Sequence, residues 1–322
     1  MVRRILFGLL ALVFVLGGAT YVWYRIELAA AFRQARSASK IVETPCGQIE
    51  YATAGEGPPV LILHGTGGGW DQGLFWGRPL TSYGFKVIAP SRFGYLRTPF
   101  PADASPEAEA DAWACFLDAL GIKRLPVMGG SAGAPPALNL GLRHPDRVSA
   151  VVLLVPGLYS PKTEEPAAAP VPAVIMNLVL RFDFPMWAAT KVVPERLQTI
   201  LFATPRELVR SLSAREKAKM DEGMRMLLPI TLRRAGLMND ARTQSTLRPY
   251  PLDKVKVRTL LVSAADDLFK TLRNARYTAQ RIPGAQLIEY PTGGHFLLGH
   301  DDDLWPRMAR FLGWSGETVS QP

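Results

Sequence analysis

The segment at 129–133 constrains the fold of this chain more than any other. It reads Gly-Gly-Ser-Ala-Gly, which fits the pattern Gly-x-Ser-x-Gly, and it directly follows an apolar run at 125–128. The residues at 132–142 predict a helix. A strand, a tight turn and a helix in this order need small residues beside the serine, whose strained backbone leaves its hydroxyl free at the strand's end. We therefore expect Ser131 to be a nucleophile, with an ordinary turn between strand and helix as the alternative.

A serine hydroxyl is a poor nucleophile at neutral pH, so this interpretation requires a histidine base and a carboxylate that orients the base. Of the four histidines in the chain, His295 is the candidate, because it follows a strand-like run at 286–290 and two glycines that would let its loop reach the serine. The other three are expected to be structural: His64 shapes a loop, His144 ends a helix and His300 begins the last helix.

A metal site is the alternative use of His295, together with His300 and the aspartates at 301–303. No second histidine stands at the helical spacing that zinc ligands favour. We therefore predict chemistry without a metal or an organic cofactor.

The carboxylate is expected after the strand-like run at 257–263, where Asp266 or Asp267 would emerge at the carboxyl end of the strand. One of the two is expected to be an ordinary turn residue. The order serine, aspartate, histidine along the chain is the order found in one particular fold.

At this point the chain resembles the α/β-hydrolase superfamily, and specifically its single-domain serine hydrolases with a lid after the sixth strand. The resemblance covers roughly residues 45 to 313. It rests on the serine turn, on Gly294-His295, and on three further motifs: His64-Gly-Thr-Gly-Gly-Gly69, Ser91-Arg-Phe-Gly-Tyr95 and His144-Pro-Asp-Arg-Val148.

The resemblance implies a catalytic triad of Ser131, His295 and Asp266. In that family the acid usually stands three residues after a glycine that closes the seventh strand, and here Ser263 occupies the place of that glycine. This departure keeps Asp267 as the alternative. Some relatives carry the acid after the sixth strand instead, but here no carboxylate follows that strand until Glu164.

The resemblance also implies an oxyanion hole, since acyl transfer develops negative charge on the former carbonyl oxygen. The backbone N–H of Ala132 would supply one donor, and the N–H of Thr66, or else that of Gly67, the other. A phosphate-binding loop is the competing interpretation of the glycines at 67–69, but no Gly-Lys-Ser/Thr follows them.

The remaining pattern predicts a doubly wound, mostly parallel α/β sheet with a helical insertion. Strand-like runs at 59–63, 86–90, 125–128, 149–155, 257–263 and 285–290 alternate with helical stretches such as 106–120. The alternation stops in the middle of the chain, which predicts these domains: an anchor and juxtamembrane segment at 1–40, the core at 41–156 and 253–322, and a helical lid at 157–252, which begins with an alanine- and proline-rich linker at 161–172.

Several apolar side chains of the lid could line an acyl pocket. We single out Met186, Trp187 and Met224, because thioethers and aromatic rings fill irregular apolar spaces. Packing within the lid itself is the commoner role of such residues.

The run from Ile5 to Tyr24 carries no charged side chain and is long enough to cross a bilayer as a helix. Arg3 and Arg4 precede it, so the positive-inside tendency places the N-terminus in the cytoplasm and the catalytic domain on the extracytoplasmic side. The alternative is a signal peptide that is cleaved to secrete the protein. We expect a retained single-pass anchor, because aromatic residues end the run.

Charge and cysteine content bear on partners and compartment. The chain has 322 residues and a net charge of +9, yet it lacks the interleaved aromatic and basic residues of a nucleic-acid site. No nucleic-acid partner is therefore expected, and the basic surface suits anionic lipid. Cys46 and Cys115 are expected to be free thiols.

Taken with the resemblance, these features predict a membrane-anchored serine hydrolase that cleaves a carboxylic ester with a small or medium apolar acyl group. An acyltransferase, a C–C bond hydrolase and a cofactor-free perhydrolase could use the same triad, so they stay as alternatives within the enzyme class. A catalytically idle binding module is the alternative outside it. Epoxide hydrolases and haloalkane dehalogenases of the same superfamily use an aspartate where this chain has Ser131, which argues against both reactions.

Overall fold

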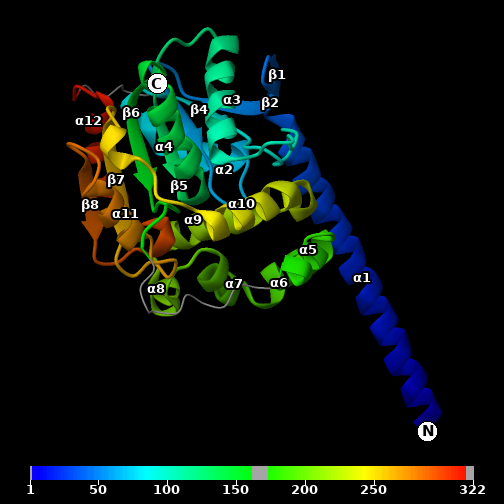
Figure 1. Ribbon diagram of the computed structural model, residues 1–322. Coiled ribbons are helices and arrows are strands. Elements are labelled where there is room, and N and C mark those ends of the chain that lie inside the picture. The colour runs from blue at the N-terminus through cyan, green and yellow to red at the C-terminus, as the bar shows by residue number, and fades with distance from the viewer. Residues whose placement is uncertain (1, 162–172, 317–322) are drawn as a thin grey trace.

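The computed structural model describes residues 2–161 and 173–316, and one sheet of eight strands organises them (Figure 1). The strand order is β1-β2-β4-β3-β5-β6-β7-β8. The pairs β1·β2 and β2·β4 are antiparallel, whereas all later neighbours are parallel. The strands are β1 (Lys40–Thr44), β2 (Gly47–Ala54), β3 (Pro59–Leu63), β4 (Lys86–Pro90), β5 (Leu125–Gly130), β6 (Val148–Leu154), β7 (Arg258–Ala264) and β8 (Gln286–Tyr290). The expected strands match β3 to β8 within two residues, so the mostly parallel α/β sheet is confirmed.

Two apolar layers cover the sheet because side chains alternate between its faces. On β3, Val60 and Ile62 pack in one buried cluster, and Leu61 and Leu63 in another. The first face is covered by α2 (Trp70–Gly77) and α12 (Asp301–Leu312). The second is covered by α3 (Pro106–Ala119), α4 (Ala134–Arg143) and α11 (Thr271–Ala279). Such burial on both faces leaves the carboxyl ends of the parallel strands as the edge where loops can build a site.

A helical insertion, defined here as residues 173–252, contains the helices α5–α10 and separates β6 from β7. Its helices are α5 (Ala173–Val179), α6 (Asp183–Val192), α7 (Pro194–Leu201), α8 (Arg206–Ser211), α9 (Ala214–Arg225) and α10 (Arg234–Thr246). The helical composition predicted for this region is therefore found, whereas the expected linker at 161–172 lies outside the described residues except for Pro161.

The helical insertion reaches the loops at the carboxyl edge of the sheet. Gly236 donates its N–H to the Gly94 carbonyl after β4, at 3.0 Å. Gln244 donates to the Gly157 carbonyl after β6, also at 3.0 Å. A Cβ atom placed on Gly294, in the loop after β8, would lie 2.7 Å from the Thr204 hydroxyl oxygen. The insertion thus lies over the carboxyl edge of the sheet, where the candidate site residues follow β5, β7 and β8.

The N-terminus forms one continuous helix, α1 (Val2–Ser37), which projects away from the sheet (Figure 1). An 18-residue window of α1 has a mean hydropathy of 2.3, and none of that window is buried. By length and composition α1 can cross a membrane, and a signal sequence at an N-terminus meets the same criteria.

The two cysteines are joined, which corrects the expectation of free thiols. Cys46 lies in the turn between β1 and β2, and a disulfide connects it to Cys115 on α3. Their Cα atoms are 6.0 Å apart although 69 positions separate them in sequence. The proximity arises because α3 packs beside β1, a long-range contact that the local sequence around either cysteine does not encode.

Candidate active site

Ser131 occupies the sharp turn between β5 and α4. Its φ angle is +49°, in the left-handed region that costs a side-chain-bearing residue about 1–2 kcal/mol. The flanking glycines permit this turn. A Cβ on Gly129 would lie 2.4 Å from the Gly133 carbonyl oxygen, and a Cβ on Gly133 would lie 2.3 Å from the Leu63 carbonyl oxygen. The strand, strained serine and helix predicted from the sequence are therefore present.

His295 lies in a short 3₁₀ turn, Gly294–Phe296, in the loop after β8. Its ring is buried, and its Nδ1 atom is 2.9 Å from Oδ2 of Asp267. The contact of Nδ1 with a carboxylate leaves Nε2 as the nitrogen that can accept a proton from a nucleophile. The predicted base thus has an acidic partner.

Asp267 is fully buried and is held by several donors. Burial raises the pKa of its carboxyl group, but the charge of His295 and hydrogen bonds from His295, Thr271 and the Phe269 N–H outweigh burial, so its pKa lies below the ordinary value. The Thr271 hydroxyl donates to Oδ2, and the Phe269 N–H donates to Oδ1 at 2.9 Å. Asp267 is therefore ionised at neutral pH and fixed in position.

Asp266, the expected acid, makes no such contact, and its assignment as the partner of His295 is wrong. Its two carboxylate oxygens accept the backbone N–H groups of Gly293 and Gly294, at 3.2 and 2.8 Å. Asp266 thus holds the loop that leads to the histidine. The error has a physical cause: the turn after β7 directs Asp267 inward, so a count of three residues from Ser263 ends one residue before the carboxylate that meets His295.

The loop after β3 contains the expected oxyanion donor, Thr66. The N–H groups on either side of Thr66 are occupied: that of Gly65 donates to Gln72 Oε1 at 2.8 Å, and that of Gly67 to the Tyr95 hydroxyl at 3.2 Å. A Cβ on Gly65 would lie 3.1 Å from Cβ of Ser131, so this loop adjoins the nucleophile. The loop favours Thr66 over Gly67 as donor, and the pairing of Thr66 with Ala132 stays a prediction.

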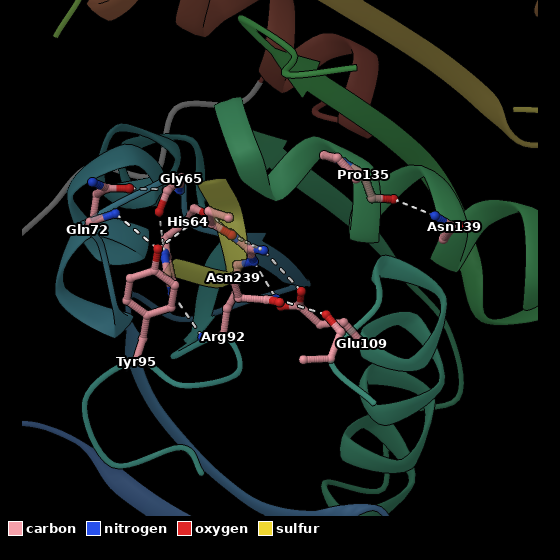
Figure 2. A network of polar contacts seen from close by, with 12 residues as sticks. His64, Gly65, Gln72, Arg92, Tyr95, Glu109, Pro135, Asn139 and Asn239 are labelled. Atoms are coloured by element: carbon pink, nitrogen blue, oxygen red, sulfur yellow. Dashed lines mark hydrogen bonds and ion pairs between the residues drawn. The ribbon is translucent and has the colours of Figure 1, made fainter. Parts of the chain in front are cut away.

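His64 shapes this loop, as expected. Figure 2 shows its ring between the loop and Arg92. Burial, reinforced by the charge of Arg92, holds the pKa of His64 well below its usual value, so the ring is neutral. Its Nε2 accepts the Arg92 backbone N–H at 2.9 Å, which leaves the proton on Nδ1 to be donated to the Gly65 carbonyl, 2.7 Å away. His64 is thus a fixed support rather than a second base.

A buried ionic network continues from Arg92 into the helical insertion (Figure 2). The Arg92 guanidinium contacts Glu109 at 2.8 Å and Asp240 of α10 at 2.9 Å. The Tyr95 hydroxyl, which accepts the Gly67 N–H, donates to Asp240 Oδ2 at 2.6 Å. The sequence analysis missed this network, although the motif at 91–95 that it used for the resemblance contains two of the members.

Arg233 joins the helical insertion to the other end of the same loop. It is fully buried and donates to the Gly68 carbonyl at 2.5 Å and to both Asp71 oxygens, at 3.1 and 2.6 Å. Two residues of the insertion therefore hold the loop that carries Thr66: Arg233 directly, and Asp240 through the Tyr95 hydroxyl.

The three predicted pocket residues differ in their surroundings. Met224 is buried in the cluster that also contains Phe296, the neighbour of His295, and Met186 packs against that cluster. Trp187 is committed elsewhere, because its indole N–H donates to Glu27 of α1 at 2.7 Å. The contacts of Trp187 thus favour a role in joining α6 to α1 over the expected role in an acyl pocket.

Two leucines that the sequence analysis did not single out lie closer to the loop at 64–69. A Cβ on Gly67 would lie 3.1 Å from Leu227 Cδ2 and 3.8 Å from Leu237 Cδ2. Both belong to the helical insertion, and their apolar side chains face the loop beside the nucleophile.

Among the described residues, no group of three or more histidine, cysteine, aspartate or glutamate side chains is placed to hold a metal ion.

The sheet topology, the strained serine and the buried histidine–aspartate pair together define a protein of the α/β-hydrolase class. The sequence from 58 to 302 matches the family described as alpha/beta hydrolase fold, and the chain belongs to this family.

Individual relatives agree with the family. A 2-hydroxy-6-oxo-6-phenylhexa-2,4-dienoate hydrolase of Burkholderia cepacia is 26% identical over 272 residues, which cover 81% of this chain and 89% of that protein. A solved α/β hydrolase fold protein from Nakamurella multipartita is 28% identical, with a TM-score of 0.70 over 85% of this chain and 99% of its own. The solved structure of a membrane phospholipase A covers 96% of both chains with a TM-score of 0.61, and its 21% identity shows the shared fold alone.

Proposed function

We propose that this protein is a serine hydrolase that cleaves a carboxylic ester of a small or medium apolar acyl group. The observation that carries the proposal is the buried pair His295–Asp267, at 2.9 Å, on the same edge of the sheet as the strained Ser131. A base held by a buried carboxylate, at the same sheet edge as a serine on a sharp turn, is the arrangement expected of a hydroxyl activated for attack on a carbonyl.

In the proposed reaction, Ser131 Oγ attacks the ester carbonyl while His295 Nε2 takes its proton. The N–H groups of Thr66 and Ala132 stabilise the oxyanion, each by roughly 3–4 kcal/mol. Collapse of the tetrahedral intermediate expels the alcohol, which receives the proton from His295. Water, deprotonated by the same imidazole, then hydrolyses the acyl-serine and restores the free enzyme. Asp267 stabilises the imidazolium in both halves, and no step needs a metal or cofactor.

The experiment that tests this proposal is labelling of the full-length protein with a fluorophosphonate probe. The wild-type protein is expected to be modified at Ser131, and Ser131→Ala to stay unlabelled. His295→Ala should label at least about a thousandfold more slowly, because the hydroxyl then lacks its base. A folded wild-type protein that does not react would identify an idle binding module instead. Profiling against esters of increasing acyl length would then define the substrate.

A C–C bond hydrolase is the second candidate, favoured by the relative from Burkholderia cepacia, whose name describes the hydrolysis of a 2-hydroxy-6-oxo-dienoate. The same triad could serve this reaction. Loss of the absorbance of that dienoate, measured beside an ester panel, distinguishes the two. Consumption of the dienoate at a higher kcat/KM than any ester would replace the first proposal.

We further propose that α1 is a retained membrane anchor and that the hydrolase domain lies on the extracytoplasmic side, with secretion after cleavage as the alternative. Three observations support this placement: the apolar run of α1, Arg3 and Arg4 before it, and the disulfide Cys46–Cys115, since disulfides persist in oxidising compartments. In this arrangement the segment at 157–252, to which the helical insertion belongs, is the lid of the site.

A further inference from the structure

The point where α1 leaves its apolar run is attached to the helical insertion by aromatic contacts. Trp23 and Tyr24 end the uncharged run, and both contact Trp187 of α6, with ring centroids 5.2 and 5.3 Å apart. The Tyr24 ring also lies edge-on to Phe184, with centroids 5.1 Å apart. Aromatic residues of this kind favour the boundary between a bilayer and water.

Polar contacts fix the same junction one turn further along α1. Glu27 accepts the Trp187 indole N–H at 2.7 Å and pairs with Lys191 at 2.7 Å. Glu27 lies only about 4.5 Å beyond Tyr24 along the helix axis, because each residue of an α-helix rises about 1.5 Å. If α1 spans the membrane, α6 is therefore held at the level of the lipid headgroups.

The helices next to this junction expose large apolar side chains to solvent. Outside α1, twelve such side chains are exposed in the described part of the chain, and eight of them fall between Val174 and Ile200. The most exposed of these eight include Phe182 at 60% and Val192 at 78%. An exposed apolar set of this density marks a surface that contacts a partner or a membrane. Six of the eight define what we call the lid face: Leu178, Val179, Phe182, Val192, Val193 and Ile200.

The orientation of the lid face fits a membrane. Figure 1 shows α5, α6 and α7 along the side of the domain toward which the N-terminal end of α1 projects. Exposed basic residues accompany the apolar ones, among them Arg181 in the turn between α5 and α6, and Arg196 on α7. Each such charge contributes about 1 kcal/mol near an anionic leaflet.

The end of α7 connects this face to the catalytic loops. The Leu268 N–H, next to the catalytic acid, donates to the Ala203 carbonyl at 3.0 Å. Leu268 and Phe269 are themselves exposed, at 46% and 54%, and the Phe269 ring contacts the His295 ring edge-on, with centroids 5.0 Å apart. Apolar side chains are thus exposed at both ends of the path from α7 to the base.

We propose that the lid face is seated in the headgroup and acyl boundary of the bilayer that α1 anchors, and that the substrate is an amphiphilic acyl lipid that enters the site directly from this bilayer. The substrate part of this inference rests on the proposed ester hydrolysis. The seating of the lid face in the bilayer is independent of ester hydrolysis, so seating and substrate entry are tested separately.

Seating is tested without any activity measurement. Full-length protein in nanodiscs of phosphatidylcholine and phosphatidylglycerol receives a single cysteine at Phe182 or Val192, labelled with the environment-sensitive fluorophore NBD. Cys46 and Cys115 are paired, so the introduced thiol is the one that reacts. The matched control is Ile41 on β1, which is also exposed, at 41%, but lies at the far end of the domain from α6 (Figure 1).

We expect blue-shifted NBD emission at Phe182 and Val192, with quenching by lipids that carry a nitroxide on the acyl chain, and neither effect at Ile41. Emission and quenching at Phe182 and Val192 equal to those at Ile41 would overturn the seating of the lid face.

Entry from the bilayer is tested with Phe182→Asp and Val192→Asp, and Ile41→Asp as control. Hydrolysis of a long-chain fluorogenic ester embedded in the nanodisc should fall at least about tenfold in the two lid-face variants, because a buried apolar contact with lipid is replaced by a charge. Hydrolysis of a water-soluble short-chain ester should change less than about twofold. Equal effects on both esters would reject entry from the bilayer. Wild-type protein that hydrolyses neither ester would refute the proposed function, while NBD quenching would still decide the seating.

Discussion

Two adjacent carboxylates at the end of β7 have different tasks because their hydrogen-bond partners differ. Asp267 is fully buried and faces His295, whereas Asp266 accepts two backbone N–H groups of the loop before that histidine. One carboxylate orients the base and the other fixes the loop that carries the base. A substitution at each position should therefore affect activity by different amounts.

We predict that Asp267→Asn lowers kcat by about a thousandfold or more, because an amide in this place no longer stabilises the imidazolium or selects the correct tautomer. Asp266→Asn should lower kcat by less than about tenfold, since its amide oxygen can still accept a backbone N–H. Steady-state kinetics on a short-chain ester, with circular dichroism as a check on folding, measures both. A larger loss at Asp266 would return that residue to the triad.

Among individual residues, the sequence predicts those whose position depends on a short stretch of neighbouring chain. Ser131 and His295 stand in short glycine-containing motifs at strand ends, and their backbone geometry follows from those motifs. The acid depends on the path of a single turn, which differs by one residue from the family pattern. The bond between Cys46 and Cys115 depends on the packing of α3 against the sheet, which no local motif encodes.

The helices of the insertion are coupled to the loop at 64–69 through buried charges. Arg233, which is fully buried, pairs with Asp71, and Asp240 pairs with Arg92. A buried charge that loses its partner destabilises a protein far more than an exposed one does, because it remains desolvated. The insertion is therefore integral to the site beneath it.

Arg233→Ala should reduce the free energy of unfolding by about 3–5 kcal/mol, since Asp71 then stays buried without its partner. Arg78→Ala is the matched control, because Arg78 also joins the core to the insertion, through Glu222, but its side chain is 62% exposed. Arg78→Ala should reduce the free energy of unfolding by only about 0–1 kcal/mol. Urea unfolding of both variants in detergent micelles, followed by tryptophan fluorescence, makes the comparison. Similar losses would contradict the role given to Arg233.

Tyr95→Phe should lower kcat by roughly tenfold while KM changes little. The hydroxyl accepts the Gly67 N–H and donates to Asp240, so its removal frees the loop that positions the Thr66 N–H and leaves both groups without this partner. Tyr83→Phe is the control, because the Tyr83 ring contacts Trp314 and packs against the buried cluster that α2 and α12 share with the sheet, away from the loop at 64–69. An unchanged kcat for Tyr95→Phe would show that this loop does not need the hydroxyl.

For the whole molecule, the sequence predicts the strands β3 to β8, their mostly parallel sheet and the helical composition of the insertion, because these follow from long hydrophobic patterns. It does not predict which face of the insertion meets α1. The contacts of Trp187 with Glu27 and Tyr24 join segments about 160 residues apart, and the indole that we expected in an acyl pocket lies at this junction instead.

The intact protein should fractionate with membranes and resist extraction by 1 M salt, whereas detergent should release it. Salt screens the charges of a basic surface, but it does not expel an inserted helix of about twenty apolar residues. Ultracentrifugation of washed membranes, followed by immunoblotting, measures the distribution. Release by salt alone, or a mature N-terminus near Ala31 by sequencing, would show that α1 is not an anchor.

Because α1 is one continuous helix, the number of residues between two of its contacts fixes the directions in which those contacts point. The helix contacts the domain around Glu27, whose carboxylate accepts the Trp187 indole N–H of α6, and again at Ala35, whose carbonyl accepts the Trp70 indole N–H at 3.3 Å. The two contacts are about 12 Å apart along the axis. One residue inserted between them would rotate Glu27 by about 100° about the helix axis, away from α6. Seven inserted residues would restore its direction within about 20°. If α1 is the membrane anchor proposed above, the number of residues between its two contacts sets the angle at which the domain meets the bilayer.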